Sequence, residues 1–160
     1  MKTRIILLVA LFALVSTTTV SAQFYKRKKV AITEVVDKSG NVQPSTKNSI
    51  RNMLTDAITN SEGYEGYASI SFLSLEMNFD RTGNISEATL RYVQKQTMDY
   101  VLVAEIVTLS KTKAQLAARI INTSTGLIVA SSSVELYTTS VDNLRPACNK
   151  LAYKLVGAIS

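Results

Sequence analysis

The ten residues 100–109 constrain the fold of this chain more than any other segment. They read Tyr-Val-Leu-Val-Ala-Glu-Ile-Val-Thr-Leu, an almost continuous apolar run that is rich in β-branched side chains. The run is too short for a typical helix. A strand with apolar residues at both odd and even positions is typically buried on both faces. We therefore expect a central strand whose two faces are covered by other elements.

Strand patterns and amphipathic helix patterns alternate along the rest of the chain. Besides 100–109, β-branched or alternating runs predict strands at 30–36, 67–73, 114–121 and 127–137. Apolar residues at helical spacing predict three helices, which begin at Pro44, Asn84 and about Asp142. The order β-α-β-α-β-β-β-α predicts the α/β (α+β) class, with a mixed sheet of about five strands and three helices packed on it.

Each predicted helix has one apolar face and a signal at one end. The first face comprises Ile50, Met53, Leu54, Ala57 and Ile58, and Gly63 is the expected C-cap. In the second helix Asn84 and Glu87 form a start that resembles a capping box, and the face comprises Ile85, Ala88, Tyr92 and Val93. In the third helix Pro146 is expected in the first turn, and the face comprises Leu144, Cys148, Leu151, Ala152, Leu155 and Ile159.

Residues 1–22 are predicted to be a secretory signal peptide. Lys2 and Arg4 form a charged region before the apolar run 5–15, and small residues stand just before the expected cleavage site, which follows Ala22. A basic lead at 23–29 and a single domain at 30–160 would follow. An uncleaved anchor stays open as an alternative. Its apolar run is shorter than the roughly 20 residues of a spanning helix, but four basic residues follow the run and two precede it, which favours an anchor orientation.

Positive charge is concentrated at the start of the chain. Of the formal charge of +6, two charges belong to the predicted signal and four to Lys26-Arg27-Lys28-Lys29, whereas the remaining 12 basic residues equal the 12 acidic ones. The body is neutral, so it gives no sign of a nucleic-acid surface. The basic run, with Phe24 and Tyr25 beside it, is a candidate for contact with an anionic lipid surface. A solvated lead without a partner is the alternative.

The residue types exclude several kinds of chemistry. The sequence has no His and one Cys, which excludes Ser-His-Asp and Cys-His catalysis, His-ligated or Cys-cluster metals, and a disulfide framework. No Cys lies near the predicted cleavage site to accept a lipid, so we do not expect a lipoprotein. We predict no catalytic residue, no metal site and no cofactor.

Two acidic positions have both a functional and a structural interpretation. Glu105 lies in the apolar run, and we favour a carboxylate at a strand edge, or one paired with a basic neighbour such as Arg119, over a functionally perturbed buried acid. Glu34 and Asp37 flank the end of the first strand, where α/β folds often bind ligands. One glycine, Gly40, follows them, which does not make a phosphate loop, so we favour a solvated turn.

Two further features are assigned to structure. Cys148 lies on the apolar face of the last helix and is predicted to be a buried small hydrophobe, inert to thiol reagents until unfolding. The sequences Asn84-Ile85-Ser86 and Asn122-Thr123-Ser124 match the glycosylation pattern, and we interpret them as capping and turn chemistry.

Three phrases, in this order, resemble a family of bacterial envelope domains. They are Lys29-Val30-Ala31-Ile32 in the first strand, 98–106 leading into the central strand, and 119–128 at the following hairpin. The family includes the periplasmic domain of curli-secretion channel subunits (CsgG-like), the outer-membrane activators of penicillin-binding proteins (LpoB-like) and the TolB N-terminal domain. The resemblance covers nearly all of 29–160 and implies a mixed sheet with packed helices, in the periplasm or at the outer membrane of a Gram-negative-type bacterium.

The chain departs from well-known members of this family in three ways. It lacks the lipid-accepting Cys, the long insertions that form transmembrane hairpins, and a long disordered tether. A pore is therefore not expected, and no specific activator role is carried over. The resemblance implies a non-catalytic exported module that binds an envelope protein, in outer-membrane or peptidoglycan-associated machinery. A homo-oligomeric scaffold subunit of a secretion or assembly complex is the alternative, and a small-ligand-binding protein or hydrolytic enzyme is a third.

Overall fold

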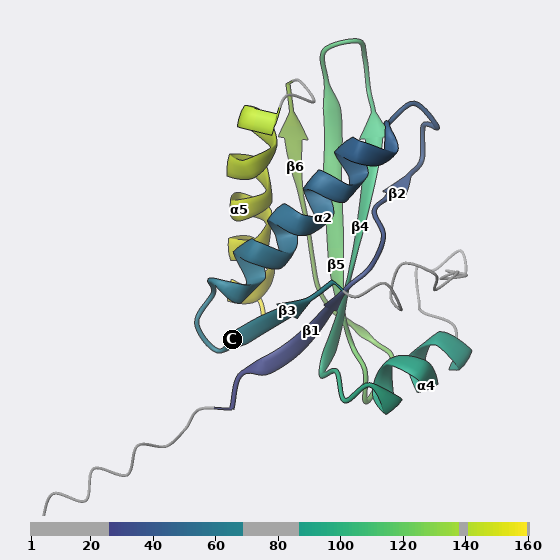
Figure 1. The fold of residues 1–160 in the computed structure, drawn as a ribbon, viewed down its shortest axis with the longest axis vertical. Helices are drawn as coiled ribbons and strands as arrows, with labels where there is room; N and C mark the ends of the chain where they lie inside the picture. Colours follow the sequence, from purple (N-terminus) through teal and green to yellow (C-terminus); the bar gives the residue numbers. More distant parts are fainter. Residues whose placement is uncertain (1–25, 69–86, 138–140, 160) are drawn as a thin grey trace, which may run out of the picture.

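The computed structural model describes residues 26–68, 87–137 and 141–159, which form one sheet with helices on both faces (Figure 1). The predicted signal peptide lies outside the described residues. The strands are β1 Lys28–Ile32, β2 Val36–Asp37, β3 Tyr64–Tyr67, β4 Tyr100–Thr108, β5 Ala114–Asn122 and β6 Ile128–Leu136. The helices are α2 Pro44–Thr59, α4 Glu87–Lys95 and α5 Val141–Gly157.

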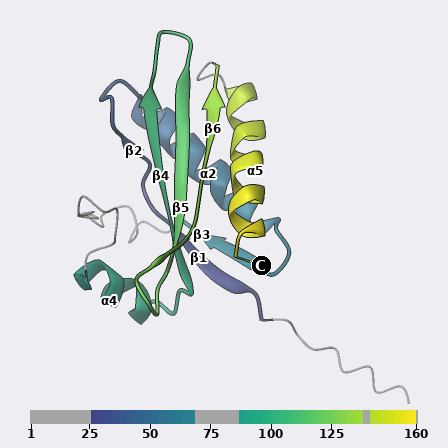
Figure 2. The ribbon, with the colours of Figure 1, turned by 180° about the vertical axis from the view of Figure 1, so that it is seen from behind.

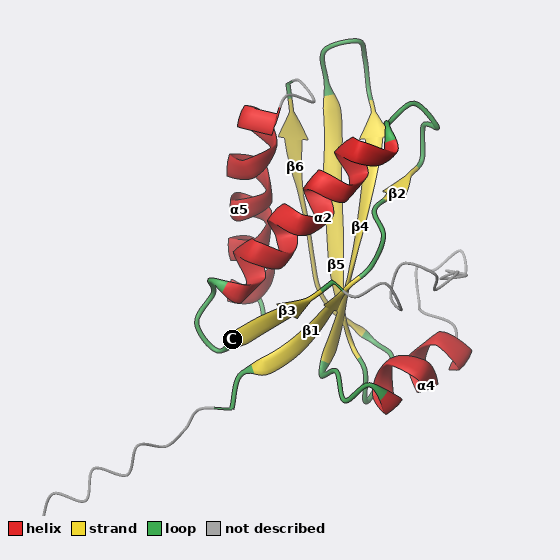
Figure 3. Ribbon diagram, in the orientation of Figure 1, coloured by secondary structure: helices red, strands yellow, loops and turns green. Residues whose placement is uncertain are grey.

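The sheet is mixed, as predicted. Its order is β3-β1-β4-β5-β6, with β2 beside β4 as a continuation of the β1 side. The β1 strand is parallel to β3 and β4, whereas β4, β5 and β6 form an antiparallel meander. The three helices and the α+β class are confirmed (Figure 3).

The predicted strand 30–36 is divided into β1 and β2, so the sheet has six strands among the described residues. Ile32 pairs with Leu102 and Val36 pairs with Glu105, so three residues of one chain segment face two residues of β4. An extra residue on one strand interrupts the ladder and bends the chain. The apolar pattern of 30–36 could not reveal this interruption, because Val35 is buried here just as it would be in an uninterrupted strand.

The core lies mainly between the sheet and the α2–α5 layer (Figures 1 and 2). Leu102, Ala104 and Ile106 of β4 face this layer, and Val101 and Val103 face a smaller cluster under α4. All five are at most 2% exposed. The prediction that this central strand is covered on both faces is confirmed.

The strand that follows α2 begins three residues before the predicted strand 67–73. β3 ends at Tyr67, where the predicted strand 67–73 begins, and residues 69–73 lie outside the described part. Gly66 lowers the strand signal, yet packing requires it, because a Cβ there would lie 2.8 Å from the carbonyl oxygen of Thr55 in α2. Gly63 is not the cap of α2: the helix ends at Thr59 with Asn60 as its C-cap, and Gly63 adopts φ +81° before β3.

The ends and faces of the other helices also differ in detail. In α4, Ala88 is exposed and Thr89 is buried, and the helix ends at Lys95 rather than Met98. The predicted cap Asn84 and its neighbour Ile85 lie outside the described residues. Pro146 lies inside α5 rather than in its first turn, because the helix begins at Val141.

Candidate functional site

The basic run is partly built into the fold. β1 begins at Lys28, so the last two residues of the predicted lead belong to a strand. The Arg27 guanidinium donates hydrogen bonds to the carbonyl oxygens of Thr59 and Ser61, where α2 ends. The described residues supply no hydrogen bond or ion pair to Lys26, which is exposed.

Asp99 is bonded to both other segments of the resemblance, 29–32 and 119–128, at one end of the sheet. Its carboxylate accepts a hydrogen bond from the Lys29 N–H at 2.8 Å and lies 3.9 Å from Lys28 Nζ. The Thr123 hydroxyl donates to the carbonyl oxygens of Met98 at 2.6 Å and Asp99 at 3.0 Å. These residues hold the starts of β1 and β4 against the β5–β6 hairpin, so their role here is architectural.

A hollow of about 830 Å³ opens beside the basic run. The Tyr64 and Tyr100 rings lie 6.4 Å apart at this hollow, and the Tyr64 hydroxyl donates to the Ile159 carbonyl at 3.4 Å. Glu62 lines the hollow together with Lys26, Arg27 and Lys28. With Asp99 nearby, this surface carries both signs of charge. Phe24 and Tyr25, the other members of the candidate lipid contact, lie outside the described residues.

Glu105 is paired, as favoured from the sequence. One carboxylate oxygen forms an ion pair with the Arg119 guanidinium, and the other lies 3.6 Å from Lys38 Nζ. The side chains of Glu105 and Arg119 are 19% and 22% exposed, so the pair is partly shielded on the sheet face that α2 and α5 do not cover. This carboxylate has two basic partners.

Asp37 organises the turn after β2. Its two carboxylate oxygens accept hydrogen bonds from the backbone N–H groups of Ser39 at 2.8 Å and Val42 at 2.7 Å. The Val42 bond, aided by that of Ser39, holds the pKa of Asp37 below its usual value of 3.8. Glu34, the other acid considered, forms an ion pair with Lys47 at 3.2 Å. The turn interpretation is confirmed.

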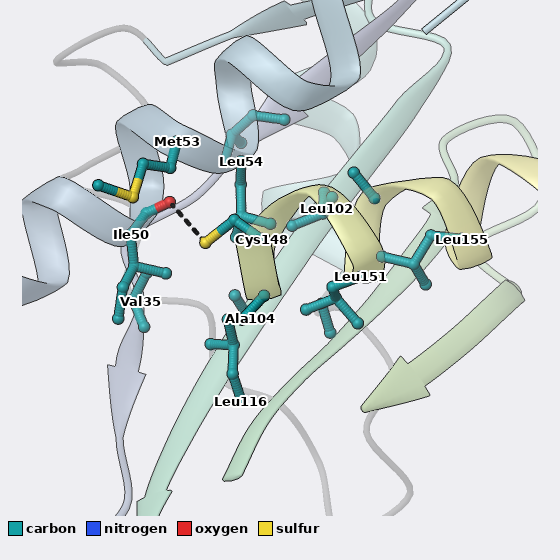
Figure 4. Close-up of a cluster of buried hydrophobic side chains, with 14 of the residues drawn as sticks. Val35, Ile50, Met53, Leu54, Leu102, Ala104, Leu116, Cys148, Leu151 and Leu155 are labelled. Carbon is teal, nitrogen blue, oxygen red and sulfur yellow. Dashed lines mark hydrogen bonds between the residues drawn. The ribbon is translucent and has the colours of Figure 1, made fainter. Parts of the chain in front are cut away.

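Cys148 is buried in the main core, as predicted (Figure 4). Its thiol faces the Ile50 carbonyl oxygen of α2 at 3.9 Å, between the two helices. Burial raises the pKa of the Cys148 thiol to about 12, and the charge of Arg145 offsets only part of this effect. The environment is that of a structural cysteine.

The Asn122 sequence is turn chemistry, as predicted. The Asn122 side-chain oxygen accepts hydrogen bonds from the N–H groups of Ser124 at 2.9 Å and Thr125 at 3.3 Å. Gly126 adopts φ +71° in the same turn. The Asn84 sequence lies outside the described residues.

Sequence reasoning missed one buried charge, Arg51 on α2. This side chain is 5% exposed, and its Nε donates to the Ile32 carbonyl oxygen at 3.2 Å. Desolvation lowers the pKa of Arg51, while the charge of Glu34 acts in the opposite direction. No spacing rule signals this residue, because it lies one position after Ile50 and becomes buried only where α2 crosses the end of β1.

Sequence reasoning also missed a groove between β6 and α5. It has a volume of about 540 Å³. One wall is the end of β6 and the following residue, 133–137, and the other comprises Asn143, Pro146, Ala147, Lys150 and Lys154 of α5. The sequence predicted both the strand and the helix that form these walls. The distance between them, however, depends on how α5 packs against the sheet.

Within the described residues, no group of three or more His, Cys, Asp or Glu side chains could hold a metal ion. In the same part of the chain, no helix combines the length and apolar character needed to cross a membrane.

Solved structures share this fold, although no protein-family model and no curated protein matches the chain. The PelC dodecamer from Paraburkholderia phytofirmans is 13% identical, with a TM-score of 0.53 over 84% of this chain and 88% of that one. The LpoB C-terminal domain from Salmonella enterica is 15% identical, with a TM-score of 0.52 over 69% and 83%. TolB from Acinetobacter baumannii is 10% identical, with a TM-score of 0.56 over 84% of this chain but 28% of that one. The resemblance drawn from the three phrases is therefore confirmed for the fold.

Proposed function

We propose that this chain is a non-catalytic module of the bacterial cell envelope that acts by binding another protein. The proposal draws on the fold shared with LpoB, TolB and PelC and on the residues that could carry chemistry. Glu105 and Asp37 are engaged in ion pairs or turn hydrogen bonds, and Cys148 is a buried neutral thiol. These groups stabilise the fold and leave no reactive set among the described residues.

The observation that carries the proposal is a concentration of exposed apolar side chains along one edge of the sheet. Leu127, Ile128 and Val129 are 60%, 37% and 39% exposed, and they are consecutive residues at the start of β6, whereas Tyr137, 60% exposed, follows the other end of the strand. Exposed apolar residues that gather in one place commonly mark a surface that binds a protein. Two other large apolar residues, Leu109 and Tyr153, are exposed elsewhere in the described part.

In-cell photo-crosslinking tests this function. A photoreactive amino acid is placed at Val129 and, as a matched control, at Asn52 on the exposed side of α2. We expect a discrete protein adduct from Val129 and none from Asn52. Absence of any adduct from Val129, in cells where the protein is folded and exported, would overturn the proposal.

Homo-oligomerisation is a second candidate, favoured by the PelC structure, which was solved as a dodecamer. In this case the adduct from Val129 would consist of two copies of this chain. Multi-angle light scattering of the purified protein separates the two readings, because a heterologous partner predicts a monomer of the mature chain and a ring predicts a large, defined multiple of its mass.

We also propose that the chain is exported by its first 22 residues and that the run Lys26 to Lys29 touches an anionic membrane, with Phe24 and Tyr25 at the interface. Intact mass of the exported protein should correspond to a chain that starts at Gln23. The Arg27 and Lys28 side chains have partners in the fold and the Lys29 ammonium lies 5.7 Å from the centre of the Tyr67 ring, so Lys26 is the member most available to lipid.

Vesicle sedimentation tests the membrane contact. Changing all four basic residues to Gln should abolish binding to vesicles that contain phosphatidylglycerol, and Lys26→Gln alone should remove a measurable part of it. Lys95→Gln on α4 is the control, because this lysine is exposed but distant in sequence from the run. Unchanged binding by the fourfold variant would refute the contact.

A further inference from the structure

We propose that the groove between β6 and α5 binds an extended, acidic segment of a partner protein, which adds a strand to the outer edge of β6. This inference rests on the protein-binding function proposed above and extends its surface from the start of β6 to the residues 133–137 at the end of the strand. The two walls of the groove supply different parts of the recognition, the strand through its backbone and the helix through its charge.

The β6 wall is an unprotected strand edge. β6 is the last strand of the sheet, and no other described strand pairs with its outer side. In an edge strand, alternate residues direct their N–H and C=O groups outward, where they can pair with another chain. The opposite edge strand, β3, has four residues, whereas β6 has nine.

The part of β6 beside the groove is also the regular part. The β5–β6 ladder shifts register between Ile120 and Ile121, opposite the start of β6, and pairs without interruption from Ala130 to Leu136. This segment reads Ala-Ser-Ser-Ser-Val-Glu-Leu and has no Pro and no basic residue. Soluble proteins commonly protect such edges with Pro, Lys, a bulge or a covering element. Ala130–Leu136 has neither Pro nor Lys and no bulge, and the groove between it and α5 is open, which favours use of the edge.

The α5 wall keeps the groove open and positively charged. Figure 2 shows α5 running alongside β6 at the side of the sheet. Lys150 and Lys154 lie one helical turn apart on this wall, and no ion pair among the described residues involves either of them. Pro146 and Ala147 form an uncharged stretch of the same wall, which leaves space for small or apolar side chains.

Strand alternation separates the acid of the groove from these lysines. Val134 and Leu136 belong to the core under α5, so the side chain of Glu135 between them lies on the opposite face of the sheet. The Tyr137 hydroxyl donates a hydrogen bond to Glu135 at 3.2 Å. The face of an added strand that meets α5 would therefore encounter two lysines, and acidic residues at alternate positions complement them.

The dimensions suit a short strand. Residues 133–137 form five positions of the groove wall, and at about 3.3 Å per residue they span roughly 17 Å. A partner segment of five or six extended residues would pair along this length, and its backbone bonds would supply affinity while the lysines select its sequence.

Selection from a displayed library of random ten-residue peptides tests the proposal on the purified mature protein. We expect enrichment of peptides with acidic residues at alternate positions and without Pro in that stretch. Added to the protein, a synthetic copy of an enriched peptide should slow hydrogen exchange of backbone amides in Ala130–Leu136. The double variant Lys150→Glu/Lys154→Glu should weaken its binding at least tenfold, and the matched variant Lys95→Glu/Lys111→Glu should not.

The results have distinct consequences. Failure to enrich acidic peptides, protection elsewhere than β6, or equal weakening by both double variants would overturn the groove assignment. Self-pairing of β6 in a stable dimer would overturn it as well, because the edge would then be occupied. The in-cell adduct from Val129 does not depend on the lysines, so its presence with a negative library result would refute the groove alone.

Discussion

The thiol of Cys148 should be almost inert in the folded protein. Burial raises its pKa from an ordinary value of 9.0 to about 12, and the residue is 0% exposed. The thiolate is the reactive form, so at pH 8 a shift of this size lowers the reactive fraction about a thousandfold relative to an ordinary thiol. Reaction of the native protein should therefore require an opening that separates α5 from α2.

The assay is the rate of reaction with an aromatic disulfide reagent at pH 8, with and without denaturant. The control thiol is Tyr153→Cys in a Cys148→Ala background, on the exposed side of the same helix, where the replaced side chain is 80% exposed. We expect the native Cys148 thiol to react at least about a thousandfold more slowly than the control and at a similar rate in denaturant. Native rates within tenfold of each other would refute the reasoning.

The same shift predicts a dependence of stability on pH. The folded state keeps the thiol neutral up to about pH 12, whereas the unfolded thiol ionises from about pH 9. Stability is therefore lost as pH rises through this window, and at pH 10 the loss is about 1.4 kcal/mol. Denaturant titrations at pH 7 and pH 10 should show this loss in the wild type relative to Cys148→Ala. Equal pH dependence of the two proteins would contradict the raised pKa.

Three further predictions concern stability measured by denaturant unfolding. Asp37→Asn should destabilise the protein at pH 7, because the single amide oxygen cannot replace both carboxylate oxygens that accept the turn hydrogen bonds. The stabilisation by Asp37 should be present above its ordinary pKa of 3.8 and should be lost as pH drops through the lowered pKa of the folded state. The variant should show less of this loss at low pH. Gly66→Ala should cost about 1–3 kcal/mol because its Cβ meets the Thr55 backbone, whereas Gly157→Ala, with no atom within 4 Å of the new Cβ, should cost little; similar effects would contradict the packing argument. Leu151→Ala should cost about 2–5 kcal/mol because Leu151 is fully buried, and a cost below 1 kcal/mol would show that the core collapses around the gap.

Local patterns predicted the elements that are long and periodic. The β4–β6 meander and the apolar face of α5 were identified because the spacing of apolar residues within each segment matches its pattern of burial. The pairing of Glu105 with Arg119 was one of two arrangements predicted for this acid. The other, a position at a strand edge, was wrong because β4 lies inside the sheet between β1 and β5. The first three residues of β3 were missed because the strand includes Gly66, whose presence reflects contact with α2 rather than strand propensity.

The candidate sites depended more strongly on tertiary structure. The sequence concentrated four charges at 26–29, but the fold placed Asp99 beside two of them and directed Arg27 to the end of α2. Contacts between residues that are 32 to 70 positions apart cannot be deduced from local spacing. Arg51 became buried for the same reason, because α2 crosses the end of β1.

The sequence by itself determined that the strand within 100–109 is covered on both faces, although its end at Leu109 is exposed. It also determined that the layers are strands and helices and that the thiol is enclosed, because alternation and helical spacing are properties of a single segment. Only the tertiary structure decided that β6 lies at the edge of the sheet and that Lys150 and Lys154 stand beside it. Strand order and helix position arise from packing between distant segments, and the groove exists only between such segments. The binding surface proposed here is therefore a product of the fold rather than of any motif in the chain.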